Sequence, residues 1–234
     1  HKEETYFYST EKEVRLGESL AEEINRRYKL ADDPLMQERV RFIGEKIASV
    51  CDRKEIRYRF FVLDEKELNA FALPGGFVYV NRGLLEKADD DELAAVLGHE
   101  IGHIVCRHSI KKLQAQLGYS VLALIAAGIA VDNKDVLRAL DSVFIQIVSG
   151  YSRQDEFMAD RLGCRYAKLA GFNSQGMLSF LDKLKQYYRN QQPQPLSYLR
   201  THPYIPDRIR VVKQELGEGI EFKDYINIEE KSRP

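Results

Sequence analysis

The chain has 234 residues, of which 44% are hydrophobic and 30% are charged, a balance typical of a folded protein rather than a disordered segment or a membrane bundle. Its 35 Lys and Arg residues nearly equal its 36 Asp and Glu residues, so the net charge of -1 gives no electrostatic reason to expect a nucleic-acid partner. A chain of this length is expected to form one domain with a single sizeable core.

The first half of the chain predicts two helices followed by a small sheet. One helix is expected to begin at Thr10, where Glu13 completes a capping box, and another at Asp33, where the following proline suits the first helical turn. Aromatic and alternating apolar residues predict three strands, over 56–63, 69–73 and 77–80. The Pro-Gly-Gly sequence between the last two strands is typical of a type II turn.

The second half is predicted to be mostly helical. Four acidic residues over 89–92 precede an apolar helical pattern, and we interpret them as an N-terminal cap because the spacing and glycine of a calcium loop are missing. Further helices are expected over 134–148, 153–170, 174–190 and 206–216. Since helices dominate a small sheet, the predicted fold class is α+β. We expect one domain, with N-terminal helices over 1–55, the core over 56–216 and a tail over 217–234.

An uncharged stretch lies between Lys112 and Asp132. Polar residues and glycines interrupt it, and its strongly apolar part, 121–131, is too short to cross a bilayer. Two interpretations stay open, a buried helix or helical hairpin, and a surface that contacts a membrane through 119–131. The three cysteines contain no CxxC pair, and their odd number disfavours a disulfide framework while leaving room for one bridge.

His99, Glu100 and His103 form an HExxH motif inside a predicted helix. Residues four apart lie one helical turn from each other on nearly the same face, so both imidazoles can point at one metal ion. Glu100 lies at the edge of that site, where its carboxylate can reach a metal-bound water but not the metal. The motif therefore predicts a metal centre with a base beside it.

A catalytic zinc also needs a third protein ligand and one position left for water. His108 lies five residues after His103, which on a continuing helix faces elsewhere, and we interpret it as a surface or capping histidine. Cys106 returns to the right face but is displaced along the axis, and we interpret it as a small buried residue.

A carboxylate from another helix is the remaining route to the third ligand. Glu156 and Asp160 lie one turn apart in a segment that is otherwise largely apolar. Glu156 as ligand and Asp160 as acceptor for the N–H of His99 would give both carboxylates partners. Spacing alone leaves open the alternative of an acidic pair on a solvated surface.

Four blocks of the sequence, in this order, resemble the M48 family of zinc metallopeptidases. They are NAFALPGGFVYVNRGLL at 69–85, ELAAVLGHEIGHIVCRHS at 92–109, YSRQDEFMAD at 151–160 and THPYIPDRI at 201–209. The resemblance implies a mostly helical, zincin-like peptidase domain that binds one Zn2+ per chain. It implies that His99, His103 and Glu156 are the zinc ligands and that Glu100 is the general base, with Asp160 behind a ligand.

The same resemblance implies that His202 lies near the metal, where in some members of the family the corresponding histidine can fill the open coordination position. His202 and Arg208 are candidates to stabilise the oxyanion of a tetrahedral intermediate. The alternatives are a helix-capping histidine, and an arginine paired with Asp207 or with the C-terminal tail.

We expect an extended peptide substrate to pair with the strand that follows the glycine turn. The residues of that predicted edge are Gly76, Phe77, Val78 and Tyr79. The alternative interpretation is an ordinary core hairpin.

The resemblance is closest to soluble members that face the periplasm. It implies a place in the bacterial cell envelope, in the periplasm or as an outer-membrane-anchored lipoprotein, with the signal segment absent from this chain. The expected function is a zinc metalloendopeptidase in quality control of unfolded or misassembled envelope and membrane proteins, with polypeptides as partners. The alternative is an assembly or chaperone-like binding factor whose zinc is structural or latched by His202.

Overall fold

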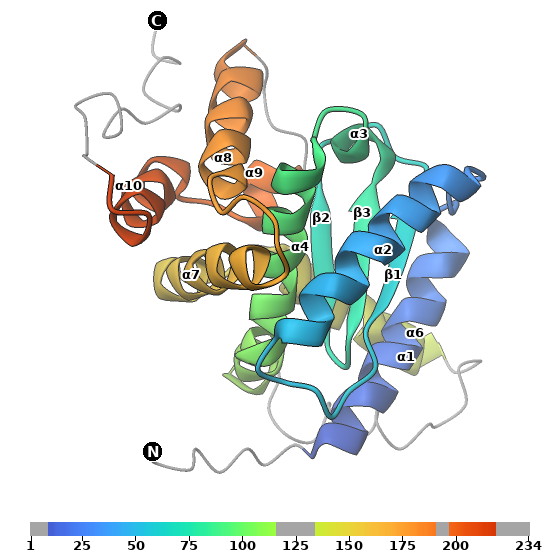
Figure 1. Cartoon of the computed structure of the whole chain (residues 1–234). Coiled ribbons are helices and arrows are strands. Elements are labelled where there is room, and N and C mark those ends of the chain that lie inside the picture. Colours follow the sequence, from blue (N-terminus) through green and yellow to red (C-terminus); the bar gives the residue numbers. More distant parts are fainter. Residues whose placement is uncertain (1–8, 116–133, 191–196, 219–234) are drawn as a thin grey trace, which may run out of the picture.

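A three-stranded sheet lies between two groups of helices (Figure 1). The structure is a computed structural model, which describes residues 9–115, 134–190 and 197–218. Among these residues, strands β1 (Arg59–Leu63), β2 (Ala70–Leu73) and β3 (Phe77–Asn81) form one sheet in the order β1-β3-β2. β3 pairs in parallel with β1 and antiparallel with β2. The strands and their mixture with helices confirm the α+β class.

Helices cover both faces of the sheet. α1 (Thr10–Arg27) and α6 (Lys134–Val148) lie on one face, and α2 (Pro34–Val50) and α4 (Asp90–Val105) on the other. α7 (Arg153–Leu169) and α8 (Gly176–Tyr187) pack on α4, and α10 (Ile205–Glu215) packs on α7 and α8. Short connections are helical at α3 (Arg82–Leu85), η1 (Tyr188–Asn190) and α9 (Tyr198–Thr201). The long helices follow the predicted ranges closely, whereas α9 was not predicted.

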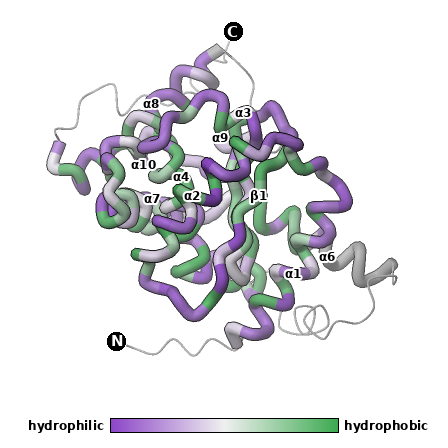
Figure 2. Tube along the Cα trace, turned by 45° about the vertical axis from the view of Figure 1, so that its right-hand side comes forward, coloured by the Kyte–Doolittle hydropathy of each residue, from purple (hydrophilic) through white to green (hydrophobic). Residues whose placement is uncertain are grey.

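The sheet divides the core because its side chains alternate between the two faces. Ala70, Ala72 and Val78 belong to the cluster beneath α2 and α4, while Phe71 and Tyr79 belong to the cluster beneath α1 and α6. Hydrophobic residues follow the strands and the inner turns of the helices, and the outer connections are hydrophilic (Figure 2). Both faces of the sheet are therefore buried.

Helix α1 begins at Thr10 as predicted, but the predicted capping box on Thr10 is wrong by one residue. Ser9 is the N-cap, and its hydroxyl accepts from the backbone N–H of Lys12. The carboxylate of Glu13 does not close a capping box, because it is buried and accepts from Arg53, from Arg107 and from the backbone N–H of Gly75. Glu13 therefore connects α1 to the segments that follow α2 and α4 and to the β2–β3 turn.

The predicted substrate edge is also wrong. β3, with Phe77, Val78 and Tyr79, is the central strand, and its backbone is paired with β1 on one side and β2 on the other. Because both sides of its backbone are paired, this segment is the core hairpin of the alternative interpretation, and its side chains and Gly76 are buried. The φ of 77° at Gly75 is the positive value that the third position of a type II turn requires.

Helices α4 and α7 approach each other along a seam of small residues. A Cβ atom added to Gly163 would lie 3.0 Å from the backbone nitrogen of His99 and 3.1 Å from the carbonyl oxygen of Ala95. A Cβ atom added to Gly98 would lie 2.9 Å from the carbonyl oxygen of Gly163. The two backbones are therefore close enough for side chains of both helices to meet in one small space.

Replacing Gly163 by alanine is expected to lower the free energy of unfolding. Alanine in an open helical position stabilises by about 1 kcal/mol, but here its methyl group meets backbone atoms of α4, and overpacking costs about 1–3 kcal/mol. Urea denaturation of the metal-free protein measures the change. Lys168→Ala, at an exposed position of the same helix, is the control and should be nearly neutral. A Gly163→Ala variant more stable than the wild type would contradict the close approach.

No helix within the described residues is long and apolar enough to cross a membrane. The predicted membrane-contacting segment, 119–131, lies outside those residues, as does most of the expected tail. All three cysteines are free, with Cys51 and Cys164 buried. Cys106, expected to be buried, is only partly so, and it caps the C-terminus of α4.

Candidate metal centre and active site

Helix α4 carries the HExxH motif through the middle of the molecule. Its N-terminus is fixed by Asp89 and Glu92, which form a reciprocal capping box, so the acidic run is the predicted cap. Every residue from Glu92 to Ile104 is buried. His99 and His103, one turn apart, direct their Nε2 atoms to within 3.0 Å of each other. The helix thus presents two imidazole nitrogens to one point.

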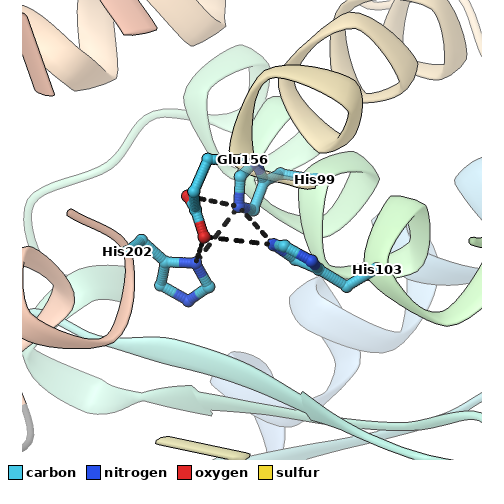
Figure 3. Close-up of side chains that lie close together, drawn as sticks. All are labelled: His99, His103, Glu156 and His202. Atoms are coloured by element: carbon cyan, nitrogen blue, oxygen red, sulfur yellow. Dashed lines mark hydrogen bonds and ion pairs between the residues drawn. The ribbon is translucent and has the colours of Figure 1, made fainter. Parts of the chain in front are cut away.

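Glu156 of α7 and His202, at the C-terminal end of α9, complete a buried group of four (Figure 3). The Glu156 carboxylate lies 3.5 Å from His99 Nε2 and 3.6 Å from His103 Nε2. His202 Nδ1 lies 3.2 Å from His99 Nε2 and 3.3 Å from Glu156 Oε1. Ligands of a tetrahedral zinc at its usual bond lengths lie about 3.3 Å apart. The nitrogen and oxygen atoms therefore have the chemistry and the spacing that zinc requires.

The charges around these four residues also suit a cation. Burial lowers the pKa of His99 and of His103 well below the usual range, and the nearby positive charges of Arg208 and the other histidines lower it further. Both imidazoles are therefore neutral, as metal ligands must be. Three carboxylates of this site, those of Glu100, Glu156 and Asp160, are fully buried together with the guanidinium of Arg208. Glu156 Oε2 is buried and makes no hydrogen bond, although the Arg208 guanidinium forms an ion pair with it at 3.2 Å. A divalent cation would offset this excess of negative charge.

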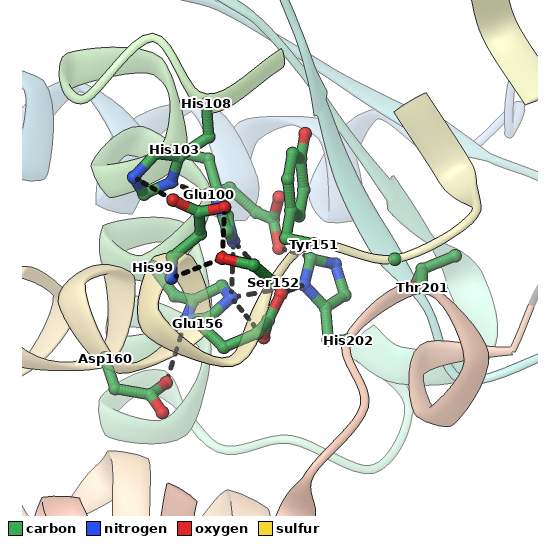
Figure 4. Close-up of polar contacts among 12 residues, drawn as sticks. His99, Glu100, His103, His108, Tyr151, Ser152, Glu156, Asp160, Thr201 and His202 are labelled. Atoms are coloured by element: carbon green, nitrogen blue, oxygen red, sulfur yellow. Dashed lines mark hydrogen bonds and ion pairs between the residues drawn. The ribbon is translucent and has the colours of Figure 1, made fainter. Parts of the chain in front are cut away.

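Asp160 accepts from His99 as the sequence predicts. Its Oδ1 lies 2.8 Å from His99 Nδ1, on the side of the ring away from the four-residue group (Figure 4). A proton on Nδ1 leaves Nε2 with its lone pair free for a metal. Asp160 therefore selects the tautomer that a ligand needs.

Arg208 does not lie where an oxyanion partner is expected. It is fully buried, and its Nε and Nη2 atoms donate to the two oxygens of Asp160 at 2.8 and 2.7 Å. Its Nη1 lies 3.2 Å from Glu156 Oε2 and also donates to the carbonyl of His202. Asp207, the alternative partner, pairs with Arg210 and Arg153 instead. The guanidinium thus contacts the carboxylates of Asp160 and Glu156 and does not face a substrate.

Glu100 is fully buried on the sheet side of α4. Its Oε1 lies 3.3 Å from His202 Nε2, and the N–H of Ala72 in β2 faces its carboxylate. Burial raises the pKa of Glu100 to about 7, against the lowering effect of His202. A carboxylate with a pKa near neutrality can both take up and release a proton at physiological pH.

The two ring nitrogens of His202 make different contacts. Nδ1 faces the His99 and Glu156 ligand atoms, while Nε2 lies 3.2 Å from the carbonyl oxygen of Ala70 in β2. Burial lowers its pKa, but the carboxylates of Glu100 and Glu156 raise it above the ordinary value. His202 therefore lies beside the other three residues of the group, and its ring also reaches the β2 edge of the sheet.

His108 is the residue that the sequence interpretation placed wrongly. It is buried, and its Nδ1 lies 2.8 Å from His103 Nδ1. The expectation assumed a continuous helix, but α4 ends at Val105 and Arg107 has a φ of 54°. This left-handed residue turns the chain so that His108 comes back beside His103. Tyr151, which stacks on the His103 ring with centroids 4.0 Å apart, was not identified either.

An HExxH helix, a carboxylate from a second helix and a small sheet define a zincin-like metallopeptidase. The family model for peptidase family M48 matches residues 34–216, and the chain belongs to this family of metallopeptidases.

The chain is 30% identical over 214 residues to a putative beta-barrel assembly-enhancing protease of Vibrio cholerae, a match that covers 85% of this chain and 43% of the relative. It is 28% identical to the beta-barrel assembly-enhancing protease of Escherichia coli K12, over 84% of this chain and 42% of that protein. It is 29% identical to the mitochondrial metalloendopeptidase OMA1 of Schizosaccharomyces pombe, over 75% and 51% respectively. The chain thus spans less than half the length of the bacterial relatives named here.

Proposed function

We propose that this chain is a zinc-dependent metalloendopeptidase, with one Zn2+ per chain held by His99, His103 and Glu156. The observation that carries the proposal is the buried convergence of these three groups, with ligand atoms 3.0 to 3.6 Å apart, beside the carboxylate of Glu100. A structural zinc site has no need of such a base, whereas peptide hydrolysis does.

The residues divide the chemistry among themselves. When bound, zinc supplies Lewis acidity, which polarises the scissile carbonyl and makes water acidic enough to lose a proton near neutral pH. Glu100 takes the proton of the attacking water on its carboxylate and passes it to the leaving amine. Asp160 and Arg208 hold His99 and Glu156 in place, and His202 offers its imidazole as a donor to the developing oxyanion.

We propose β2, rather than β3, as the strand that pairs with the substrate. Within the part of the chain that the structure describes, β2 is an edge strand, because β3 is its one neighbouring strand. Its backbone meets the site, because Ala70 contacts His202 and Ala72 faces Glu100. An extended peptide that adds to this edge would place its scissile bond beside Glu100 and gain affinity with little demand on its side chains. Such recognition suits unfolded substrates.

A role in quality control of unfolded or misassembled envelope and membrane proteins follows as the biological part of the proposal. It rests on relatives that are named for enhancing β-barrel assembly. The location that we propose together with this role is the bacterial cell envelope, in the periplasm or at the outer membrane.

The alternative, an assembly or chaperone-like binding factor, is favoured by one specific observation. His202 Nδ1 stands with the other three ligand atoms, all within 4.8 Å of one another. Four protein ligands around zinc form a closed site without a place for water. A chain that stays in this arrangement would bind polypeptides without cleaving them.

Removal of the metal separates the two functions. The purified chain is expected to contain one zinc per chain and to cleave casein, to lose cleavage after dialysis against 1,10-phenanthroline, and to recover it with added Zn2+. If the wild type is zinc-loaded but inactive while His202→Ala cleaves casein, the enzyme is latched by His202. If neither variant cleaves casein with zinc bound, the binding factor is the correct assignment.

A further inference from the structure

The ring of His103 is held from the side opposite the proposed metal. Its Nδ1 lies 2.8 Å from Nδ1 of His108, and the ring of Tyr151 stacks on its face at an interplanar angle of 19° (Figure 4). The Tyr151 hydroxyl is itself fixed, 2.7 Å from Ser109 Oγ. His103 thus has less freedom to rotate than the HExxH motif alone provides.

The contacts continue from His108 to a carboxylate. His108 Nε2 lies 3.2 Å from Oδ1 of Asp155, in the first turn of α7. The hydroxyl of Ser152, the N-cap of α7, donates to Asp155 Oδ2 at 2.6 Å and accepts from the Asp155 backbone N–H. The start of α7 therefore fixes this carboxylate one residue before Glu156.

Only one arrangement of protons satisfies every contact when His103 binds metal through Nε2. A neutral imidazole that ligates through Nε2 carries its proton on Nδ1. His103 Nδ1–H must then donate, and His108 Nδ1 must accept. The proton of a neutral His108 is consequently on Nε2, where it donates to Asp155 Oδ1. The series of hydrogen bonds thus runs outward from the proposed metal to the carboxylate of Asp155, whose side chain is 34% exposed.

The backbone conformation that brings His108 into place is strained and separately anchored. Arg107 has a φ of 54°, a left-handed conformation that is uncommon for residues other than glycine. Its Nε and Nη2 atoms donate to Oε2 of the buried Glu13 at 2.8 and 2.7 Å. The left-handed conformation of Arg107 is what brings His108 back beside His103 instead of leaving it at the surface.

We propose that His108 and Asp155 are positioning residues that fix the tautomer and orientation of the zinc ligand His103, as Asp160 does for His99. The inference rests on the proposed zinc site and extends it. Each histidine ligand then has its own acceptor for Nδ1–H. For His99 the acceptor is the carboxylate of Asp160, and for His103 it is the imidazole of His108, which Asp155 holds in turn. Neither His108 nor Asp155 contacts the metal or the substrate in this assignment. Their contribution is to the affinity and the electronic properties of the metal centre.

Zinc affinity of the full chain, measured by competition with a chromophoric chelator, tests the inference. His108→Leu removes the acceptor and is expected to weaken Zn2+ binding about 10- to 100-fold, the usual cost of losing such a partner. His108→Asn keeps a carbonyl oxygen near the position of Nδ1, so it should recover part of that loss. Asp155→Asn keeps an acceptor for Nε2–H but removes its charge, and should weaken binding less than His108→Leu.

A matched control separates positioning from general destabilisation. Ile110 is fully buried two residues later and belongs to the apolar cluster beneath α1 and α6, so Ile110→Ala should lower stability without changing zinc affinity. Bound Co2+ gives a second measure, since its visible absorption should shift in His108→Leu and not in Ile110→Ala.

The inference is overturned if His108→Leu binds Zn2+ as tightly as the wild type, or if Ile110→Ala loses the same affinity. A wild type that binds no Zn2+ would overturn the proposed function itself, so the two failures are distinguishable.

Discussion

Replacing Glu100 by glutamine is expected to lower kcat for casein or peptide cleavage by about 10²- to 10⁴-fold, the usual contribution of a general acid–base group. Glutamine has nearly the same shape but cannot accept the proton of the attacking water. Glu100 contributes no ligand atom to the four-residue group, so the variant should retain one zinc per chain. A continuous assay with a quenched peptide and a metal determination on the same sample measure both quantities.

The kinetic pattern is as informative as the loss itself. Because Glu100 acts on the reacting atoms and not on remote parts of the substrate, kcat should fall while KM changes little. Asp90→Asn, at an exposed acidic residue in the first turn of the same helix, is the control and should have normal activity. A zinc-loaded Glu100→Gln variant with wild-type kcat would exclude Glu100 as the base.

Replacing Arg208 by methionine is expected to lower the free energy of unfolding of the metal-free protein by about 3–5 kcal/mol, because removal of one partner leaves buried carboxylates without compensation. The guanidinium holds both oxygens of Asp160 and one of Glu156, and all three residues are fully buried. Methionine fills part of the volume, so the loss reports the charge and its hydrogen bonds. Urea denaturation monitored by circular dichroism measures it.

The matched control lies on the same helix. Arg210→Met removes a partly exposed ion pair with Asp207 and should cost about 0–1 kcal/mol. The comparison also decides between two roles for Arg208. An oxyanion partner would lose kcat at nearly unchanged stability, whereas the contacts observed here predict a large loss of stability together with weaker zinc binding.

The long helices were predictable because their signals are local. Asp33 caps α2 and Asp89 caps α4 as expected, since a cap and an apolar stripe are encoded within a few neighbouring residues. The position of β3 within the sheet was not predictable in this way. A hairpin of β2 and β3 shows which strands are neighbours, but the parallel partner β1 comes from an earlier segment. Only tertiary structure decides which strand of the hairpin keeps a free edge.

The same distinction holds for the site. His99 and His103 could be placed together from helical spacing, because both lie on one face of α4. The spacing of Glu156 and Asp160 suggested the contact of Asp160 with His99 but left open an acidic pair on a solvated surface. His108 does not, because its position depends on a left-handed residue after the helix, and Arg107 has no local signal for that conformation. The actual partners of Arg208 were also hidden, since they lie on α7, far away in the sequence.

Helix α1 sets a limit on where this domain can be cut. The segment matched to the M48 family begins at residue 34, and α1 ends before it, at Arg27. Yet α1 supplies Leu16, Leu20 and Ile24 to the cluster on one face of the sheet, and its Glu13 anchors Arg107 beside His108. A fragment trimmed to the start of the family match would expose that face to water and release the turn that holds His108. The unit that folds is therefore longer than the segment that the family model matches.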